Sequence, residues 1–249
     1  MLKEITDKSY EIFGRYNPAR PLDICTECCM TPEDESRLAS MRVQDIPAQL
    51  LSEYNDGAKP LKTSVEEIKH FLPRYLELIG LYQFPTHSAE LSFSRVIPFD
   101  ENEWTETETG ILREFSRAYF RKCLSIYPIP SASDSITTIL IMFQGAGSGL
   151  RELFAVYELL EIWEAEATNE SLLHFRDLYF HGFDPHHPAK LSSPFGDSEL
   201  ASVLRRWIES ENTRQLFSAA IEKLILEDNS LSDIDAGELS LLYEILGNG

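Results

Sequence analysis

The sequence is short of basic residues and has no long apolar run. It contains 22 lysines and arginines against 41 aspartates and glutamates, so its formal net charge is −19. A field of this sign repels nucleic acid and anionic membranes, and we expect neither as a partner. No stretch approaches the roughly 18 uninterrupted apolar residues of a membrane span, and the N-terminus shows no basic region followed by an apolar stretch. These absences predict a soluble, cytoplasmic protein.

Cysteines are also few. The chain has four, at Cys25, Cys28, Cys29 and Cys123. The first three are packed into five positions and cannot all pair with the single distant one, which argues against a disulfide framework. A reducing compartment fits this distribution better.

The motifs of common catalytic and phosphate-binding sites are missing from the sequence. The glycine-rich segment Gln144–Gly149 has the spacing of neither G-x-G-x-x-G nor a P-loop, so it predicts a turn between helices. The tripeptide Gly147-Ser148-Gly149 is not the G-x-S-x-G of a hydrolase nucleophile. We therefore expect a protein that is not an enzyme.

What the chain does contain is helical periodicity. Its composition, 43% hydrophobic and 11% aromatic, predicts a globular fold in spite of the charge. We expect a mostly α protein with about ten helices in a single irregular domain over residues 1–249. The least regular stretch suggests a subdomain boundary within 83–103, and a strand-like alternation suggests a minor β element near 91–98.

Capping signals and periodicity place most of these helices. Ser64 and Glu67 form a capping box ahead of a helical stripe that contains Pro73, which predicts one kinked helix or two short ones. The apolar run Ile136–Phe143 suits a buried helix or a strand, and Leu150–Trp163 suits a helix at the centre of the fold. Further helices are expected at 31–39, 104–126, 169–180, 198–209, 213–226 and 235–246.

The cysteine cluster is one candidate for chemistry. Cys25 and Cys28 form a C-x-x-C, whose spacing lets two thiolates reach one zinc ion from a turn. Cys29 adds a third ligand only with awkward geometry, because it is adjacent to Cys28, and His70 or Cys123 are the candidates to complete the site. Ordinary structural thiols are the favoured interpretation, with no cofactor. A zinc-binding protein or metal-dependent enzyme is the alternative.

Histidines gather in one loop near the C-terminal third of the chain. His181, Asp184, His186 and His187 lie within the eight positions 181–188, which also hold two prolines. Such a loop can preorganise metal ligands or a general base. Adjacent histidines point in different directions, however, and no H-E-x-x-H is present, so we expect an exposed polar loop.

Acidic residues concentrate in the last hundred positions. Residues 150–249 carry 19 acidic and 7 basic side chains, against 22 and 15 in residues 1–149. A run of glutamates follows the predicted central helix, and such a run is most often a solvated face. Its functional interpretation is an anionic patch for a basic partner. The candidate contact residues are Glu161, Glu164, Glu166 and Glu170.

Two short segments carry a resemblance to a known group of proteins. Cys25–Met30, together with His70–Leu78, resembles a family of uncharacterised bacterial helical proteins. Some of its members are associated with toxin genes, as immunity proteins of contact-dependent growth inhibition or related polymorphic toxin systems. The resemblance covers roughly residues 10–80 and carries over no catalytic residue.

Charge and resemblance together suggest a function. Antibacterial toxin domains are often nucleases with basic surfaces, and an acidic protein can occupy such a surface with strong electrostatic steering. We therefore expect an acidic immunity protein that binds and neutralises a basic toxin domain, the cognate toxin of the system. A helical adaptor, whose acidity serves only solubility, is the other alternative.

Overall fold

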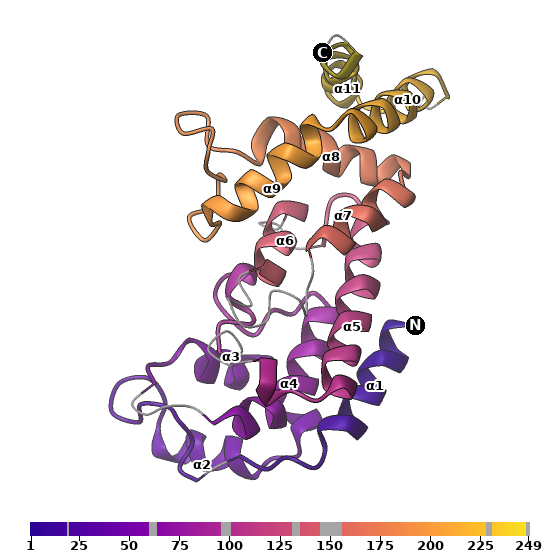
Figure 1. The fold of residues 1–249 in the computed structure, drawn as a ribbon. Helices are drawn as coiled ribbons and strands as arrows, with labels where there is room; N and C mark the ends of the chain where they lie inside the picture. Colours follow the sequence, from indigo (N-terminus) through magenta and orange to yellow (C-terminus); the bar gives the residue numbers. More distant parts are fainter. Residues whose placement is uncertain are drawn as a thin grey trace. The chain divides into compact units, whose positions relative to one another are not determined.

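Helices make up the regular structure of this protein. The computed structural model describes residues 1–18, 20–59, 64–95, 101–130, 135–144, 156–227 and 231–247. Within these ranges it has eleven α-helices and three short 3-10 helices (Figure 1). The one β feature among the described residues is an isolated bridge between Phe183 and Leu191. The prediction of a mostly α protein is confirmed. No helix in these ranges has the length and apolar character needed to cross a membrane.

Residue contacts divide the chain into two compact units. The first unit contains Met1–Tyr119 and the end of α6 from Met142, and the second contains Phe120–Ile141 and Val156–Gly249. The division therefore runs through α5 (Glu106–Leu124) and α6 (Ile136–Gln144). The expectation of a single domain with an inner boundary at 83–103 stays a prediction.

The first unit begins with four helices and one 3-10 turn. These are α1 (Leu2–Phe13), α2 (Pro32–Ser40), η1 (Val43–Asp45), α3 (Ala48–Asp56) and α4 (Val65–Gly80). Helix α1 packs against α4, and α2 packs against α3. Thr31 caps α2 by accepting a hydrogen bond from the amide of Asp34 at 3.1 Å, as its sequence signature predicts.

Helix α4 runs through Pro73 as one helix, which decides between the two predicted alternatives. Ser64 caps its start by accepting from the amide of Glu67 at 3.2 Å. Apolar side chains buried on both sides of the proline offset the backbone hydrogen bond that Pro73 cannot donate. They are Ile68, Phe71, Leu72, Leu76 and Ile79.

The minor β element expected near 91–98 is wrong for residues 91–95. Leu91 ends a 3-10 helix, η2 (Ala89–Leu91), and residues 92–95 form turns; positions 96–98 lie outside the described residues. Ser92, Phe93 and Arg95 are all buried, so the apparent alternation does not separate an inner from an outer face. The hydroxyl of Ser92 donates to the carbonyl of Ala89 at 2.7 Å, which stabilises the turn instead.

The second unit is built around α10. After the short η3 (Glu101–Glu103) and α5, the chain forms α6, α7 (Val156–Ala165), α8 (Asn169–His181), α9 (Ser198–Glu209), α10 (Glu211–Glu227) and α11 (Asp233–Gly247). Helix α10 contacts α7, α8, α9 and α11. Ile136–Gln144 is a buried helix, so the helix alternative was the correct one for this apolar run.

Aromatic rings fill the core that α7, α8, α9 and α10 share. Trp163 is fully buried, 5.2 Å from Trp207 between ring centroids, and Phe175 stacks on Phe217 at 4.0 Å. The burial of Trp163 and of most of α7 confirms a buried helix over the described part of the predicted segment 150–163, since residues 150–155 lie outside the described ranges. Three side chains of α7 lie outside this core: Tyr157 is 61% exposed, and Glu161 and Ala165 are exposed as well.

Candidate functional site

The four candidate glutamates lie around the C-terminal end of α7. Glu161 and Glu164 are on α7, Glu166 follows it, and Glu170 is in the first turn of α8. Glu161 is exposed, whereas the other three are half-buried. Their surroundings differ enough that each has to be considered by itself.

Glu164 makes contacts within the protein. Its carboxylate accepts hydrogen bonds from Trp207 Nε1 at 2.7 Å, from the hydroxyl of Thr213 at 2.8 Å and from Asn212 Nδ2 at 3.2 Å. These donors belong to α9 and to the start of α10, so this side chain ties α7 to both helices. Hydrogen bonds to a charged acceptor are about twice as strong as neutral ones, which gives Glu164 a structural role.

Glu166 and Glu170 also have local roles. Glu166 pairs with Arg121 Nε at 2.6 Å, and both side chains are about two-fifths exposed. Glu170 lies at the positive end of the helix dipole of α8, whose first turn is capped by Thr168. Glu161 is thus the candidate glutamate whose carboxylate is most open to a partner.

A groove beside Glu161 adds features that the sequence did not reveal. It is an open hollow of about 310 Å³ between α7 and α9, and we call it the α7–α9 groove. Leu160, Val203 and Trp207 give it an apolar floor, while Tyr157 and Glu161 line it from α7. Tyr157 and Glu161 are four residues apart and therefore lie on one face of the helix. Neither Tyr157 nor Trp207 belongs to a sequence motif.

A second hollow in the same unit has a different character. It measures about 550 Å³ and is lined mostly from α10 and α11, with Glu211, Arg214, Glu222 and Tyr243 among its residues. Arg214 donates to the carbonyl of Leu246 at 2.7 Å, and the hydroxyl of Tyr243 donates to Glu222 at 3.2 Å. Much of its polar lining is therefore engaged in bonds between α10 and α11.

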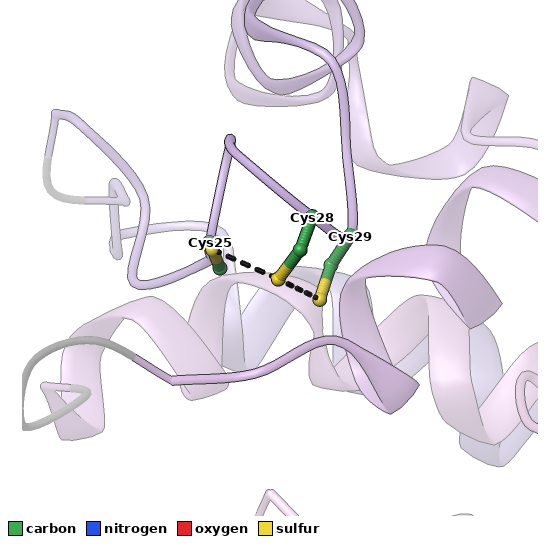
Figure 2. A group of neighbouring side chains, drawn as sticks. All are labelled: Cys25, Cys28 and Cys29. Carbon is green, nitrogen blue, oxygen red and sulfur yellow. Dashed lines mark hydrogen bonds between the residues drawn. The ribbon is translucent and has the colours of Figure 1, made fainter.

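The three clustered cysteines come together in the first unit. Figure 2 shows them on the turn that precedes α2, with the side chains of Cys28 and Cys29 pointing the same way. The sulfur of Cys28 lies 3.1 Å from that of Cys25 and 3.1 Å from that of Cys29, and all three sulfurs are within 4.8 Å of one another. The expectation that Cys29 is awkwardly placed is wrong, because the turn aims both neighbouring side chains at one point.

Hydrogen bonds distinguish the three thiols. The thiol of Cys28 and the backbone amides of Glu27 and Cys28 donate to Cys25, and they lower the pKa of Cys25. The bonds that Cys28 makes with Cys25 and Cys29 raise the pKa of Cys28 to about 12. Cys29 accepts from the amide of Ala58 at 3.3 Å. Cys25 thus accepts hydrogen bonds that favour its thiolate, whereas the bonds of Cys28 favour its protonated thiol.

The proposed fourth ligands are placed elsewhere. His70 is outside the cysteine cluster: its Nδ1 lies 2.8 Å from the carbonyl oxygen of Tyr16, its ring packs edge-on against Phe71, and burial lowers its pKa. Cys123 is fully buried in the second unit, where its carbonyl oxygen lies 3.1 Å from His174 Nε2. Among the described residues, the cluster of potential ligand atoms consists of the three sulfurs.

The histidine loop is exposed, as expected. His181, His186 and His187 all face solvent. Asp184 accepts hydrogen bonds from the amides of His186 at 2.8 Å and of His187 at 3.1 Å, and these bonds lower the pKa of Asp184. The carboxylate therefore stabilises the turn, and the two adjacent imidazoles are displayed on its outside.

In comparisons with known proteins, the chain matches no family model, no curated protein and no solved structure. The resemblance of residues 10–80 to toxin-associated helical proteins therefore stays a prediction.

Proposed function

We propose that this chain is an acidic cytoplasmic immunity protein that binds a basic toxin domain through the α7–α9 groove. The observation that supports it most directly is the exposed ring of Tyr157 next to Glu161, above an apolar floor. A large exposed aromatic side chain is typical of an interface, where tyrosine and tryptophan are enriched.

The groove has the chemistry to receive a lysine or arginine side chain. The face of Tyr157 attracts a cation, and the carboxylate of Glu161 forms a charged hydrogen bond with it. Leu160 and Trp207 supply apolar surface for the methylene stem of the incoming side chain. Arg206 at the same groove adds one positive charge, which favours a partner with an acidic residue beside its basic one.

Net charge would bring such a partner to the groove. Residues 150–249 hold 19 acidic and 7 basic residues, so this part of the chain attracts a basic domain at long range. Attraction of this kind increases the association rate, and salt reduces it because the Debye length is only about 8 Å at physiological ionic strength. Neutralisation then requires only that the bound chain cover the toxin's substrate surface.

The test uses the toxin domain encoded next to this gene. The two proteins are expressed together, growth protection is scored, and the affinity of the purified pair is measured by calorimetry at low and physiological salt. We expect Tyr157→Ala to weaken binding about tenfold, a loss of about 1.4 kcal/mol, because it removes an aromatic contact of the interface. We expect Glu161→Gln to weaken binding at low salt and to reduce the salt dependence of the affinity.

Two matched variants control for general effects. Leu226 is 76% exposed on α10, so Leu226→Ala removes a similar exposed apolar side chain outside the groove. Glu244 is exposed on α11, so Glu244→Gln removes one acidic charge from a helix that does not line the α7–α9 groove. Absence of both complex and protection contradicts the proposed function. A complex that Tyr157→Ala leaves unchanged contradicts the groove, and weak salt dependence favours the adaptor alternative.

A further inference from the structure

The three sulfurs of the cysteine cluster lie close enough together to supply three of the four ligands of a tetrahedral metal site. Zinc lies about 2.3 Å from each thiolate, which places any two sulfurs of a tetrahedral site about 3.8 Å apart. Cys28 lies 3.1 Å from each of its two neighbours, and all three sulfurs are within 4.8 Å. Cys28 is the exposed member, so a small rotation of its side chain opens the space for an ion.

We propose that Cys25, Cys28 and Cys29 bind one thiophilic metal ion of the zinc class, with a fourth position left to water or to another external ligand. Binding forms three metal–sulfur bonds and releases the three thiol protons to solvent, with no transfer of electrons. Soft thiolate ligands select zinc and similar ions over magnesium or calcium. The site is built entirely from a five-residue turn.

Backbone amides around the sulfurs supply the outer shell that such sites need. The amides of Glu27 and Cys28 donate to the sulfur of Cys25, and the amide of Ala58 donates to the sulfur of Cys29 at 3.3 Å. Hydrogen bonds of this kind offset the negative charge that three thiolates concentrate, and they fix the ligand orientation. Two of the three ligands are thus held before any ion arrives.

A buried arginine stabilises the two backbone segments around the cysteine cluster, one just before the turn and one next to Ala58. Arg95 is 1% exposed and donates to the carbonyl of Asp23 at 2.9 Å and to that of Gly57 at 3.1 Å. Its guanidinium also lies over the ring of Tyr54, 4.0 Å from the centroid. The amide of Cys25 donates to the carbonyl of Ala58 at 2.8 Å. The cysteine turn is therefore bonded directly to the segment whose amide donates to Cys29.

Preorganisation of this kind is what a small metal site requires. A turn that had to order itself on binding would lose conformational entropy and affinity. Here the turn is closed by hydrogen bonds from the amides of Cys29 and Met30 to the carbonyl of Cys25, at 3.3 and 3.2 Å. The remaining adjustment is confined to side-chain rotation.

The test is a metal titration of the full chain under reducing conditions. Protein stripped with a chelator and kept with a phosphine reductant is titrated with cobalt, whose absorption reports tetrahedral thiolate ligation, and zinc is then measured by competition with a chromophoric chelator. We expect one equivalent of either ion. Cys28→Ser should weaken zinc binding by at least about 100-fold. Loss of a residue that only hydrogen-bonds to a metal ligand already costs about 10 to 100-fold in affinity, and Cys28 is itself a ligand.

Two controls separate this site from other ligands on the chain. Cys123→Ala removes the buried cysteine of the second unit, and the double variant His186→Ala, His187→Ala removes the exposed imidazoles. Both should keep wild-type zinc affinity. Circular dichroism confirms that Cys28→Ser folds, and alkylation followed by mass spectrometry provides a second measurement, in which zinc should protect Cys25, Cys28 and Cys29.

Three outcomes contradict the metal site. They are binding of much less than one equivalent, zinc affinity that Cys28→Ser leaves unchanged, and a pair of sulfurs that forms a disulfide even with reductant present. None of them bears on the α7–α9 groove, because the cluster belongs to the first unit and the groove to the second.

Discussion

Lys69 Nζ lies 2.9 Å from Glu108 Oε2, and both side chains are buried in the first unit. The ammonium of Lys69 is also 4.9 Å from the ring centroid of Trp104. Glu108 accepts further hydrogen bonds from the amide of Thr105 at 2.9 Å and from Arg15 at 2.7 Å. This carboxylate therefore joins α4, the start of α5 and the segment after α1.

We expect Glu108→Gln to lower the free energy of unfolding by about 3–5 kcal/mol, because it leaves the ammonium of Lys69 buried without a counter-charge. Urea unfolding at neutral pH measures the change. Glu114→Gln is the matched control: Glu114 is also on α5 and pairs with Lys8 at 3.6 Å, but both side chains are about half exposed. Its loss should cost at most about 1 kcal/mol. Equal costs for the two variants would contradict the role given to Glu108.

The same carboxylate predicts a pH dependence. Burial by itself would raise the pKa of Glu108, but hydrogen bonds from Lys69, Thr105, Tyr16 and Arg15 lower it to about 2, from an ordinary value of 4.5. Between these two values the unfolded chain binds a proton that the native chain does not, so stability falls as pH decreases from 4.5 toward 2.

Urea unfolding at several pH values checks this dependence. Above pH 4.5 the contribution of Glu108 is fully present, and it amounts to about 3 kcal/mol from the shift in its pKa. The difference in unfolding free energy between the wild type and Glu108→Gln should therefore shrink as pH falls toward 2. A difference that stays constant over this range would show that Glu108 titrates normally.

The sequence predicted helix bounds well where a capping residue is followed directly by apolar residues at helical spacing. Helix α9 runs over Ser198–Glu209, the predicted residues, and Asp197 caps it by accepting from the amide of Leu200 at 2.7 Å. The strand expected near 91–98 failed for the opposite reason. Arg95 occupies an inward position of an alternating pattern, but its guanidinium binds carbonyls at Asp23 and Gly57, and no local pattern reports contacts so distant in sequence.

The candidate sites show the same limit. The C-x-x-C motif identified Cys25 and Cys28, but the position of Cys29 depends on the backbone of the turn, which the spacing does not specify. The acidic run identified Glu161 and Glu164 as equivalent residues. Only the fold separates them, because the donors to Glu164 are 43 to 49 positions away in the chain.

Two glycines should respond in opposite ways to alanine. A Cβ at Gly57 would lie 2.1 Å from Ile24 Cδ1 and 3.2 Å from Cys29 Cβ, and Ile24 is buried, so Gly57→Ala should destabilise the protein by about 1–3 kcal/mol. Gly110 lies inside α5, and a Cβ there would meet no described atom within 4 Å. Gly110→Ala should stabilise the protein by about 0.5–1 kcal/mol. Thermal unfolding of both variants measures the two signs.

The Gly57 substitution also tests the packing beneath the cysteine turn. Because a Cβ added at Gly57 would displace Ile24 and Cys29, Gly57→Ala should increase the reactivity of the cluster thiols toward alkylating reagents, whereas Gly110→Ala should not. Unchanged reactivity together with unchanged stability would mean that the turn adjusts at little cost.

Glu164 and Glu161, three residues apart on α7, should differ in what they contribute. Glu164→Gln weakens three hydrogen bonds to a charged acceptor, from Trp207, Thr213 and Asn212, and should lower the free energy of unfolding by about 2–3 kcal/mol. Glu161 is exposed, so Glu161→Gln should change stability by less than about 0.5 kcal/mol. Urea unfolding, followed through tryptophan fluorescence, measures both, since Trp207 donates directly to Glu164. Equal stability of the two variants would show that the bonds of Glu164 do not hold α7 against α9, and its carboxylate would then be as open to a basic partner as that of Glu161.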